Sequence, residues 1–291
     1  MPQDPRHAEP KQEFPRQQQS TPGSEARMSP RPDFGEASYR GHGRLQDRVA
    51  LITGGDSGIG RAVALAFARE GAHVAIAYLD EHEDAEETKR LVEAADRKAL
   101  LVAGDLAEEA LRARAVRETV ERYSRLDVLV NNAAFQGRAV ERFEDLDPER
   151  VERTFRVNIV AMFSLVRHAL PHLRPGASII NTSSVQAYHP NPQILDYAAT
   201  KGAIRTFTQG LAQELTGRRD PRQRGRAGAD LDAAHRAVLP GAEGRAARPE
   251  RPMERAGQPA EVAPVFVFLA SDEARYVSGE VLGVTGGSPL A

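Results

Sequence analysis

The sequence predicts an α/β fold, a doubly wound parallel sheet in a single domain over residues 45–291, preceded by an N-terminal tail and arm over residues 1–44. Short apolar runs of strand length alternate with amphipathic helical segments, which is typical of βαβ units. The apolar runs are nearly continuous, as expected for strands covered by helices on both faces. A glycine-rich turn joins the first run to the first helix. These three observations together predict the parallel sheet.

Composition narrows the classes of function that we expect. The chain has 291 residues, a formal net charge of −2 and no cysteine, so it can bury a substantial core but has no disulfide, thiolate nucleophile or thiolate metal site. The near-neutral charge gives no electrostatic reason to expect a nucleic acid or an anionic membrane as partner. No apolar run reaches membrane-spanning length and no signal-peptide core is present, so we expect a cytoplasmic protein without a bound metal.

The N-terminal residues 1–44 are rich in proline and contain a run of three glutamines. Such a segment has too little apolar surface to offset its ordering entropy, so we expect residues 1–27 to be a disordered tail. The next part holds Phe34, Tyr39 and Leu45. We therefore expect an extended arm that lies on the domain or on a neighbouring subunit.

The glycine-rich turn lies in a strand–turn–helix unit. A strand over residues 49–52 precedes it, and the helix after it ends at Gly71. Gly54 permits a tight exit from the strand, Gly58 lets the backbone approach a pyrophosphate, and Gly60 lets helix and strand pack closely. A helix N-terminus offers N–H groups and a positive dipole end to phosphates. An ordinary glycine loop is the alternative, but this context favours dinucleotide binding.

The remaining elements follow in regular order. Strands are expected over residues 74–78, 99–103, 126–130, 177–181 and 281–284, and helices over 82–97, 107–123, 148–173, 196–215 and 259–270. Right-handed crossovers would make the sheet doubly wound, and ligands of such sheets lie beyond the carboxyl ends of the strands. Because Asp105, Asn131 and Ser184 follow predicted strands, we expect them to face one crevice together with the glycine turn.

Tyr197 and Lys201 are four residues apart on a predicted helix, so they share a face. An ammonium beside a phenol stabilises the phenolate and lowers the pKa of the tyrosine toward a range useful for proton transfer. Ser184 could donate a hydrogen bond to a substrate oxygen. Each feature alone is weak, since such pairs are common on helix surfaces and a serine after a strand is usually a cap. The combination behind a glycine turn is more specific.

The segments TGGDSGIG, NNAA, NTSSVQAY and YAATK resemble those of the short-chain dehydrogenase/reductase family, whose members have the Rossmann fold. The resemblance covers residues 28–216 and 253–287, and within the family it is strongest to the bacterial general-stress oxidoreductases. It implies an oxidoreductase that transfers a hydride between NAD or NADP and an alcohol or carbonyl substrate, such as a small aldehyde, a ketone or a sugar. It also implies a homotetramer and a role in the stress response.

The resemblance implies a role for each catalytic candidate. Tyr197 would be the general acid/base, and Lys201 would lower its pKa and hold the ribose hydroxyls. Ser184 would orient the carbonyl group, with Ser183 as the less favoured choice. Asn158 would anchor a water that links Lys201 to solvent, and the alternative is an ordinary asparagine in a helix bulge.

The same resemblance implies the residues that contact the cofactor. The pyrophosphate would lie against Gly54, Ser57, Gly58, Ile59 and Gly60, the adenine against Asp105 and Leu106, and the adenosine side against Asn131 and Ala133. Asp105 could also be a helix N-cap, and both roles are compatible. Tyr78 and Leu79 stand where NAD-specific relatives have an acidic residue, yet Asp80 follows and no arginine is there for a 2′-phosphate. With Asp56 inside the turn, charge favours NAD.

Residues 218–251 depart from the family pattern. They hold nine arginines and three large aliphatic residues, so we predict no strand and an irregular segment where the family has its sixth strand, a Pro-Gly pair and a threonine. Codons can be chosen for residues 220–235 that, when read one base later, encode IRVNAVAPGPIWTPL, which is that missing segment. We therefore hypothesise a one-base insertion near residues 218–219 and a compensating deletion before Met253. The alternatives are a lineage-specific basic loop and, if the chain is made as written, an impaired cofactor-binding or scaffold protein.

Overall fold

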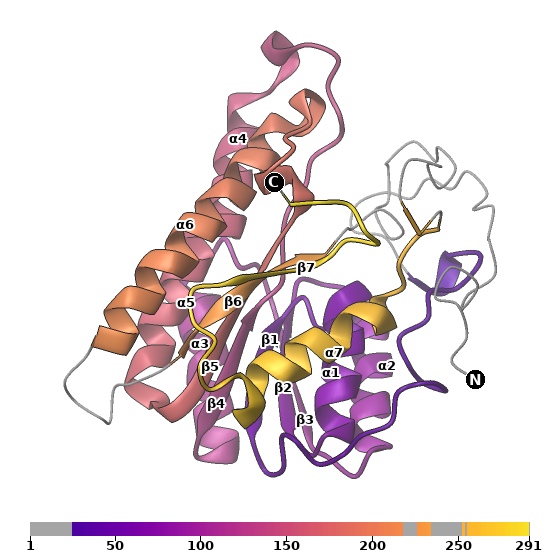
Figure 1. The fold of residues 1–291 in the computed structure, drawn as a ribbon, viewed down its shortest axis with the longest axis vertical. Coiled ribbons are helices and arrows are strands. Elements are labelled where there is room, and N and C mark those ends of the chain that lie inside the picture. Colours follow the sequence, from indigo (N-terminus) through magenta and orange to yellow (C-terminus); the bar gives the residue numbers. More distant parts are fainter. Residues whose placement is uncertain (1–24, 218–225, 234–251, 254, 291) are drawn as a thin grey trace.

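The computed structural model describes residues 25–217, 226–233, 252–253 and 255–290. They form one seven-stranded sheet of order β3-β2-β1-β4-β5-β6-β7, in which every neighbouring pair is parallel (Figure 1). The strands are β1 (Val49–Thr53), β2 (His73–Tyr78), β3 (Ala99–Ala103), β4 (Leu126–Asn131), β5 (Leu173–Ser183), β6 (Arg226–Ala233) and β7 (Val281–Val284). The predicted doubly wound α/β fold is confirmed.

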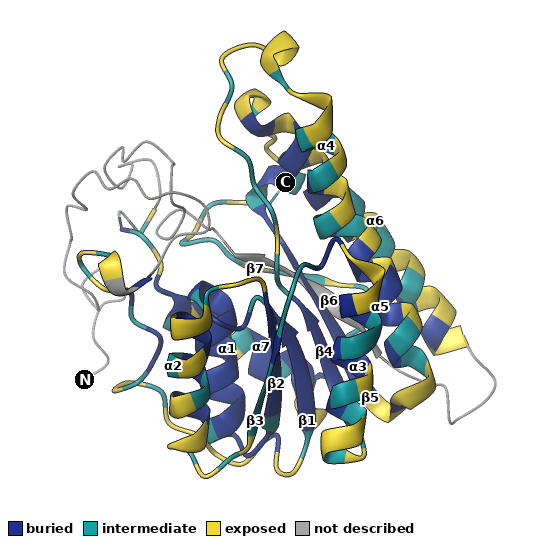
Figure 2. Ribbon diagram, turned by 180° about the vertical axis from the view of Figure 1, so that it is seen from behind, coloured by how far each residue is buried: buried dark blue, intermediate teal, exposed yellow. Residues whose placement is uncertain are grey.

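Helices cover both faces of the sheet. They are α1 (Gly58–Arg69), α2 (His82–Glu93), α3 (Glu109–Tyr123), α4 (Pro148–Phe155), α5 (Ala161–Ala169), α6 (Leu195–Gly217) and α7 (Pro259–Ala270). Side chains of α1, α2 and α7 form one core with alternate residues of β1 and β2, and side chains of α3, α5 and α6 form a second core with the other residues of those strands. Figure 2 shows the buried strands between helices with exposed outer surfaces. Among the helices that the structure describes, none is long and apolar enough to cross a membrane.

The predicted helix over residues 148–173 is one helical run with a change of winding. A π-helical turn, Arg156–Val160, separates α4 from α5, and a short 3-10 turn ends the run. π turns are rare and are often found at functional sites. This one contains Asn158, a residue with a predicted catalytic role.

Strand β6 corrects the expectation that residues 218–251 contain no strand. It lies between β5 and β7 and pairs in parallel with both. Strand pairing uses backbone N–H and C=O groups, which every residue except proline supplies. A segment without the apolar pattern of a buried strand can therefore still pair between β5 and β7. Residues 218–225 and 234–251 lie outside the described residues. The prediction of an irregular segment there stays a prediction.

The N-terminal arm lies on its own domain. Phe34 and Leu45 are fully buried in the core that α1 forms with the sheet. The Tyr39 hydroxyl donates a 2.7 Å hydrogen bond to Glu70, and the Arg69 guanidinium donates to the backbone carbonyls of the arm at Gly35. Of the two expected locations of the arm, the structure shows the domain itself.

The described part of the chain begins within the segment that was predicted to be a disordered tail. Residues Glu25–Arg27 form a 3-10 turn, and Glu25 is buried against the glycine turn. The expectation of disorder for residues 1–27 is therefore wrong at its last three positions, because a charged contact outweighs the low hydrophobicity of the segment. Residues 1–24 lie outside the described residues.

Candidate functional site

The candidate residues gather at the carboxyl edge of the sheet. Thr53, Asn131 and Ser183 end β1, β4 and β5, which are parallel neighbours, so their ends meet at the same edge. A small cavity lies at this edge. Its lining includes residues that end or follow strands of the sheet and one residue of the π turn, namely Thr53, Leu106, Asn131, Ala133, Thr182 and Asn158. Four of these six residues carry predicted roles in cofactor binding or catalysis.

The glycine turn has the close contacts that its sequence predicts. Gly54 and Gly58 have φ values of +62° and +54°, which favour glycine. A Cβ on Gly60 would lie 1.8 Å from the carbonyl oxygen of Gly54, so the first turn of α1 rests directly on the strand exit. The Asn132 amide holds that exit by donating to the carbonyls of Thr53 and Gly54 at 3.1 and 3.2 Å.

Two further residues of the turn lie at the N-terminus of α1. Ser57 is the N-cap residue, with extended backbone and no capping bond from its side chain. Ile59 follows in the first helical turn and is buried in the core. The backbone N–H groups at this helix end are the kind of donors that bind phosphate oxygens.

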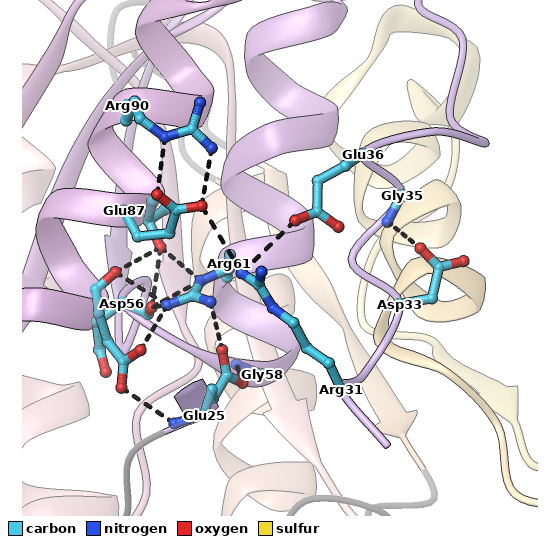
Figure 3. A network of polar contacts seen from close by, with 12 residues as sticks. Glu25, Arg31, Asp33, Gly35, Glu36, Asp56, Gly58, Arg61, Glu87 and Arg90 are labelled. Atoms are coloured by element: carbon cyan, nitrogen blue, oxygen red, sulfur yellow. Dashed lines mark hydrogen bonds and ion pairs between the residues drawn. The ribbon is translucent and has the colours of Figure 1, made fainter. Parts of the chain in front are cut away.

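Arg61 is a buried cation at the centre of a polar network behind the glycine turn (Figure 3). Its guanidinium donates to the Asp56 carbonyl at 2.7 Å and to the carboxylate of Asp84 on α2 at 3.0 Å. It also forms a 2.7 Å ion pair with Glu25 of the N-terminal segment. One side chain therefore connects the turn, α2 and the N-terminal segment. The sequence gives no sign of this role, since the partners lie on three separate segments.

Asp56, within the turn, has a carboxyl group that is almost fully buried. Burial, with a smaller contribution from the charge of Glu81, raises the pKa of this carboxyl to about 6. The group is therefore mostly ionised at neutral pH but becomes protonated under mildly acidic conditions.

Asp105 and Leu106 follow β3, as predicted. Asp105 accepts a hydrogen bond from the backbone N–H of Ala107 at 2.8 Å and from the Arg153 guanidinium at 2.5 Å. Although burial raises the pKa of this carboxyl, the bonds from Arg153 and Ala107 lower it more, below its usual range. The N-cap of α3 is Glu108, so Asp105 stabilises the preceding turn rather than capping the helix as the alternative suggested. The ion pair with Arg153 spans 48 residues, and no sequence pattern indicates it.

Asn131 and Ala133 lie at the end of β4. The Asn131 amide donates to Asn181 on the neighbouring strand at 2.8 Å, and the Ala133 N–H donates to Thr53 at 3.1 Å. The Asn131 Oδ1 atom is buried and has no hydrogen-bond partner within the described structure. An unpaired buried acceptor is costly unless a ligand or water satisfies it. The unpaired Asn131 oxygen could be satisfied by a bound dinucleotide, and the glycine turn at Gly54–Gly60 has the conformation that suits such a ligand.

Tyr197 and Lys201 lie together on α6, as their spacing predicts. Both are buried, and the Lys201 ammonium lies 5.2 Å from the centre of the Tyr197 ring. The ammonium also donates a 2.7 Å hydrogen bond to the Thr182 carbonyl at the end of β5. This bond fixes the lysine between its own helix and the strand edge, over the Tyr197 ring.

The two candidate serines have different partners. The Ser183 hydroxyl donates to the backbone carbonyl of Lys201 at 3.2 Å, so it supports α6. Ser184 caps the short 3-10 helix Val185–Ala187 and accepts the Gln186 N–H at 3.3 Å. This bond leaves the proton of the Ser184 hydroxyl available as a donor, which favours Ser184 over Ser183 for the substrate contact. Ser184 also has the capping function that was the alternative interpretation of a serine after a strand.

Asn158 connects three segments. Its Oδ1 accepts the Phe135 N–H at 2.7 Å, and its Nδ2 donates to the Phe135 carbonyl at 3.0 Å and to the Thr200 hydroxyl at 3.1 Å. The side chain therefore links the π turn to the segment after β4 and to the residue before Lys201. The predicted role in holding a water stays a prediction.

Asp196, directly before Tyr197, forms a contact that sequence reasoning missed. Its carboxylate is fully buried and receives two bonds from the Arg150 guanidinium of α4, at 2.9 and 2.8 Å. The Thr154 hydroxyl donates a third bond at 2.8 Å. The start of α6, where Tyr197 lies, is thereby fixed to α4. The only sequence signal was an acidic residue beside the tyrosine, with its partner 46 positions away.

Comparison with known proteins identifies the family of the chain. A family model described as enoyl-(acyl carrier protein) reductase matches residues 54–288. The crystal structure of a short chain dehydrogenase from Burkholderia cenocepacia in complex with NADP superposes with a TM-score of 0.76 and 32% identity, covering 84% of this chain and 98% of that one. The chain belongs to the short-chain dehydrogenase/reductase family of NAD(P)-dependent oxidoreductases.

Two relatives within the short-chain dehydrogenases/reductases match nearly the whole chain. General stress protein 39 of Bacillus subtilis is 45% identical over 290 residues, covering 95% of this chain and 96% of the relative. Glucose and ribitol dehydrogenase of Daucus carota is 44% identical over 284 residues, covering 94% and 96%. The predicted resemblance to the general-stress oxidoreductases is confirmed.

Proposed function

We propose that this short-chain dehydrogenase/reductase interconverts an alcohol and a carbonyl compound, with Tyr197 as the general acid/base. The observation that supports this most is the Lys201 ammonium held 5.2 Å from the centre of the Tyr197 ring, beside the strand edge that carries the glycine turn. A buried positive charge next to a phenol favours the phenolate. The same edge holds an unpaired acceptor on Asn131 and a turn suited to phosphate.

The residues of the site divide the chemistry among them. The nicotinamide cofactor, when bound, supplies or accepts the hydride. The Tyr197 hydroxyl gives a proton to the substrate oxygen during reduction and takes it back during oxidation. Lys201 keeps the pKa of that hydroxyl low enough for both directions. The Ser184 hydroxyl donates a hydrogen bond to the same substrate oxygen and stabilises the charge that develops there.

Asn158 and Lys201 have further proposed functions. Lys201 would bind the ribose hydroxyls of the cofactor, and Asn158 would hold a water that carries protons between Lys201 and solvent. The bonds from Asn158 to Phe135 and Thr200 support this, because they fix the π turn next to the lysine. The Asn158 side chain itself is occupied by these bonds, so the backbone of the turn is the better candidate to hold the water.

The cofactor contacts follow from the arrangement at the strand edge. The pyrophosphate would lie against the turn from Gly54 to Gly60, including Ser57, Gly58 and Ile59. The adenosine would lie between Asp105 with Leu106 on one side and Asn131 with Ala133 on the other. The unpaired Asn131 Oδ1 and the positive φ of Gly54 and Gly58 at this edge support the arrangement.

The charges around the turn favour NAD over NADP. Asp56 is ionised above pH of about 6, and the residue after β2, Leu79, is followed by the exposed Asp80. These charges would repel a 2′-phosphate, and no arginine in this stretch compensates. The carrot relative, named glucose and ribitol dehydrogenase, supports a sugar or polyol within the proposed substrate class of alcohols and carbonyl compounds.

We include a homotetramer in the proposal. Phe155, Val160 and Phe163 are exposed on the helical run of α4 and α5, and exposed apolar side chains that gather in one region are typical of subunit contacts. Light scattering should give a mass about four times the 31.7 kDa of the chain. A monomer at micromolar concentration would contradict this part of the proposal.

A direct experiment tests the proposed function. NADH and NADPH are titrated against the purified chain by fluorescence, and reduced cofactor formation is then followed with a panel of alcohols, polyols and sugars. The proposal expects binding, with NADH preferred, and turnover of at least one substrate class that is lost in Tyr197→Phe. Binding without turnover of any substrate would instead favour the alternative of a cofactor-binding protein that lacks activity.

A further inference from the structure

Glu25 places a buried carboxylate against the N-terminus of α1. One of its oxygens accepts the Gly58 N–H at 2.5 Å, and the other lies 2.7 Å from the Arg61 guanidinium. The residue is 3% exposed, although it is the first described residue of a polar N-terminal segment. Figure 3 shows the carboxylate between Gly58 and Arg61. Neither the proposed reaction nor the cofactor contacts assign it a function.

We infer that Glu25 is a positioning residue for the glycine turn, so that the N-terminal arm is a working part of the dinucleotide site. The inference rests on the proposed function in taking the turn at Gly54–Gly60 as the place where the pyrophosphate binds. The part of the inference that does not depend on the cofactor is the coupling between the arm and the turn, and this coupling can be measured without ligand.

The turn needs external support because glycine loses more conformational freedom on ordering than any other residue. Two of the contacts that hold the turn come from Arg61 and Glu25. Arg61 binds the Asp56 carbonyl, and Glu25 binds the Gly58 N–H. Because Glu25 and Arg61 are also paired with each other, the two supports form one unit. Loss of Glu25 frees the peptide group before Gly58, at a residue with positive φ.

Glu25 approaches the turn from the side of α2. Its own backbone N–H donates to Asp84 of α2 at 3.3 Å, and α2 connects β2 to β3. The opposite side of the turn packs on the β4 end, where a Cβ on Gly54 would touch Ala133. The cavity with the other cofactor candidates is on that β4 side. Glu25 therefore contacts the turn from the α2 side, whereas the cavity with Asn131 and Ala133 lies on the β4 side.

The arm has anchors at Glu70 that do not involve Glu25, while the Phe34 ring packs against Arg61, the partner of Glu25, at 4.9 Å. Glu70 accepts bonds from the Tyr39 hydroxyl at 2.7 Å and from Arg44 at 2.7 Å, and Phe34 is buried. A Glu25 variant should therefore keep the arm in place and fold normally. A matched control is Glu36, on the same arm, whose contact to Arg31 is long at 3.8 Å and exposed.

The variants are E25A, E25Q and E36A in the full chain. Hydrogen exchange of a peptide covering residues 53–60 is measured without ligand, and the KM for NADH and the kcat are measured with a substrate found active. E25A should exchange faster in this peptide and raise the cofactor KM about tenfold, as expected for loss of one hydrogen bond to a buried group, with kcat within about twofold. E25Q keeps an acceptor for Gly58 and should recover most of both effects, and E36A should match the wild type.

Two results would overturn the inference. One is E25A with exchange and cofactor KM equal to wild type, which would leave Glu25 with no role beyond packing. The other is tighter cofactor binding in E25A, which would mean that the carboxylate competes with the pyrophosphate. If the wild type binds neither NADH nor NADPH while E25A accelerates exchange, the proposed function fails and the coupling of arm to turn stands.

Discussion

The contact between Arg150 and Asp196 allows a prediction with two opposite outcomes. Replacing Arg150 by Gln leaves the Asp196 carboxylate buried and unneutralised, next in sequence to Tyr197. Replacing Asp196 by Asn leaves the Arg150 guanidinium without its carboxylate. Unpaired negative charge raises the pKa of a nearby phenol and unpaired positive charge lowers it. Lys201, 5.2 Å from the centre of the phenol ring, stays in place in both variants.

The cost in stability follows from burial. The Asp196 side chain is fully buried and that of Arg150 is 14% exposed. Breaking a buried pair by removing one partner costs about 3–5 kcal/mol, so we expect about 3 kcal/mol for R150Q, with Thr154 still bonded to the carboxylate. D196N should cost less, about 1–2 kcal/mol, because water can reach part of the arginine. At about 2–4 °C for each kcal/mol, R150Q should lower Tm by roughly 6–12 °C.

The assay is the pH dependence of kcat/KM for alcohol oxidation, measured below the Tm of each variant. In the proposed mechanism alcohol oxidation needs the phenolate of Tyr197, so activity should fall on the acidic side of its pKa. R150Q should move the acidic fall of the pH–activity profile to higher pH, and D196N should move it to lower pH. If both limbs move the same way, or neither moves, the pair only supports the fold. An Arg142 variant is a suitable control, because its contact to Glu144 is exposed at 3.9 Å, and it should change nothing measurable.

Three more predictions follow from individual groups. Burial raises the pKa of Glu70, but bonds from Arg44 and Tyr39 lower it to about 2, so its native state binds fewer protons than the unfolded chain. Its stabilisation is present above its usual pKa of 4.5 and lost as pH falls toward 2, and urea unfolding should show the wild-type advantage over E70Q shrinking on acidification; a constant difference would refute this. In the wild type the preference for NAD over NADP should decline below pH of about 6, as Asp56 becomes protonated. D56N should lower this preference at neutral pH and remove most of its dependence on pH. An equal preference in variant and wild type would place Asp56 away from the ribose. For residues 218–251, gene sequencing and peptide masses should reveal a reading-frame error, and an intact frame with matching masses would remove that hypothesis.

The sequence predicted those parts of the fold that rest on local hydrophobic pattern. The buried strands, the glycine turn and the Tyr197–Lys201 spacing are all carried by a few neighbouring residues, and the structure has the first two as predicted and places the pair on one helix face. It could not predict β6, because the strand is held through backbone groups that any sequence provides.

The missed contacts of the site have a different cause. Arg61 meets Glu25, Arg153 meets Asp105, and α6 is fixed to α4 through Asp196, each across a long stretch of chain. Charged residues are common on helix surfaces, so their spacing does not reveal which of them become buried pairs. Only the packing of helices against the sheet brings these partners together, and the exposed pairs along α2 show how ordinary the same residue types are elsewhere.

The measurement that tests the central claim most directly compares wild type and Tyr197→Phe in NADH binding and in single-turnover hydride transfer to one active carbonyl substrate. The phenol hydroxyl is the only group removed, so NADH affinity should stay within about threefold while the transfer rate falls by about 10²–10⁴, the range of a general acid. A variant that binds NADH normally and transfers hydride within about fivefold of the wild-type rate would show that Tyr197 does not supply the proton.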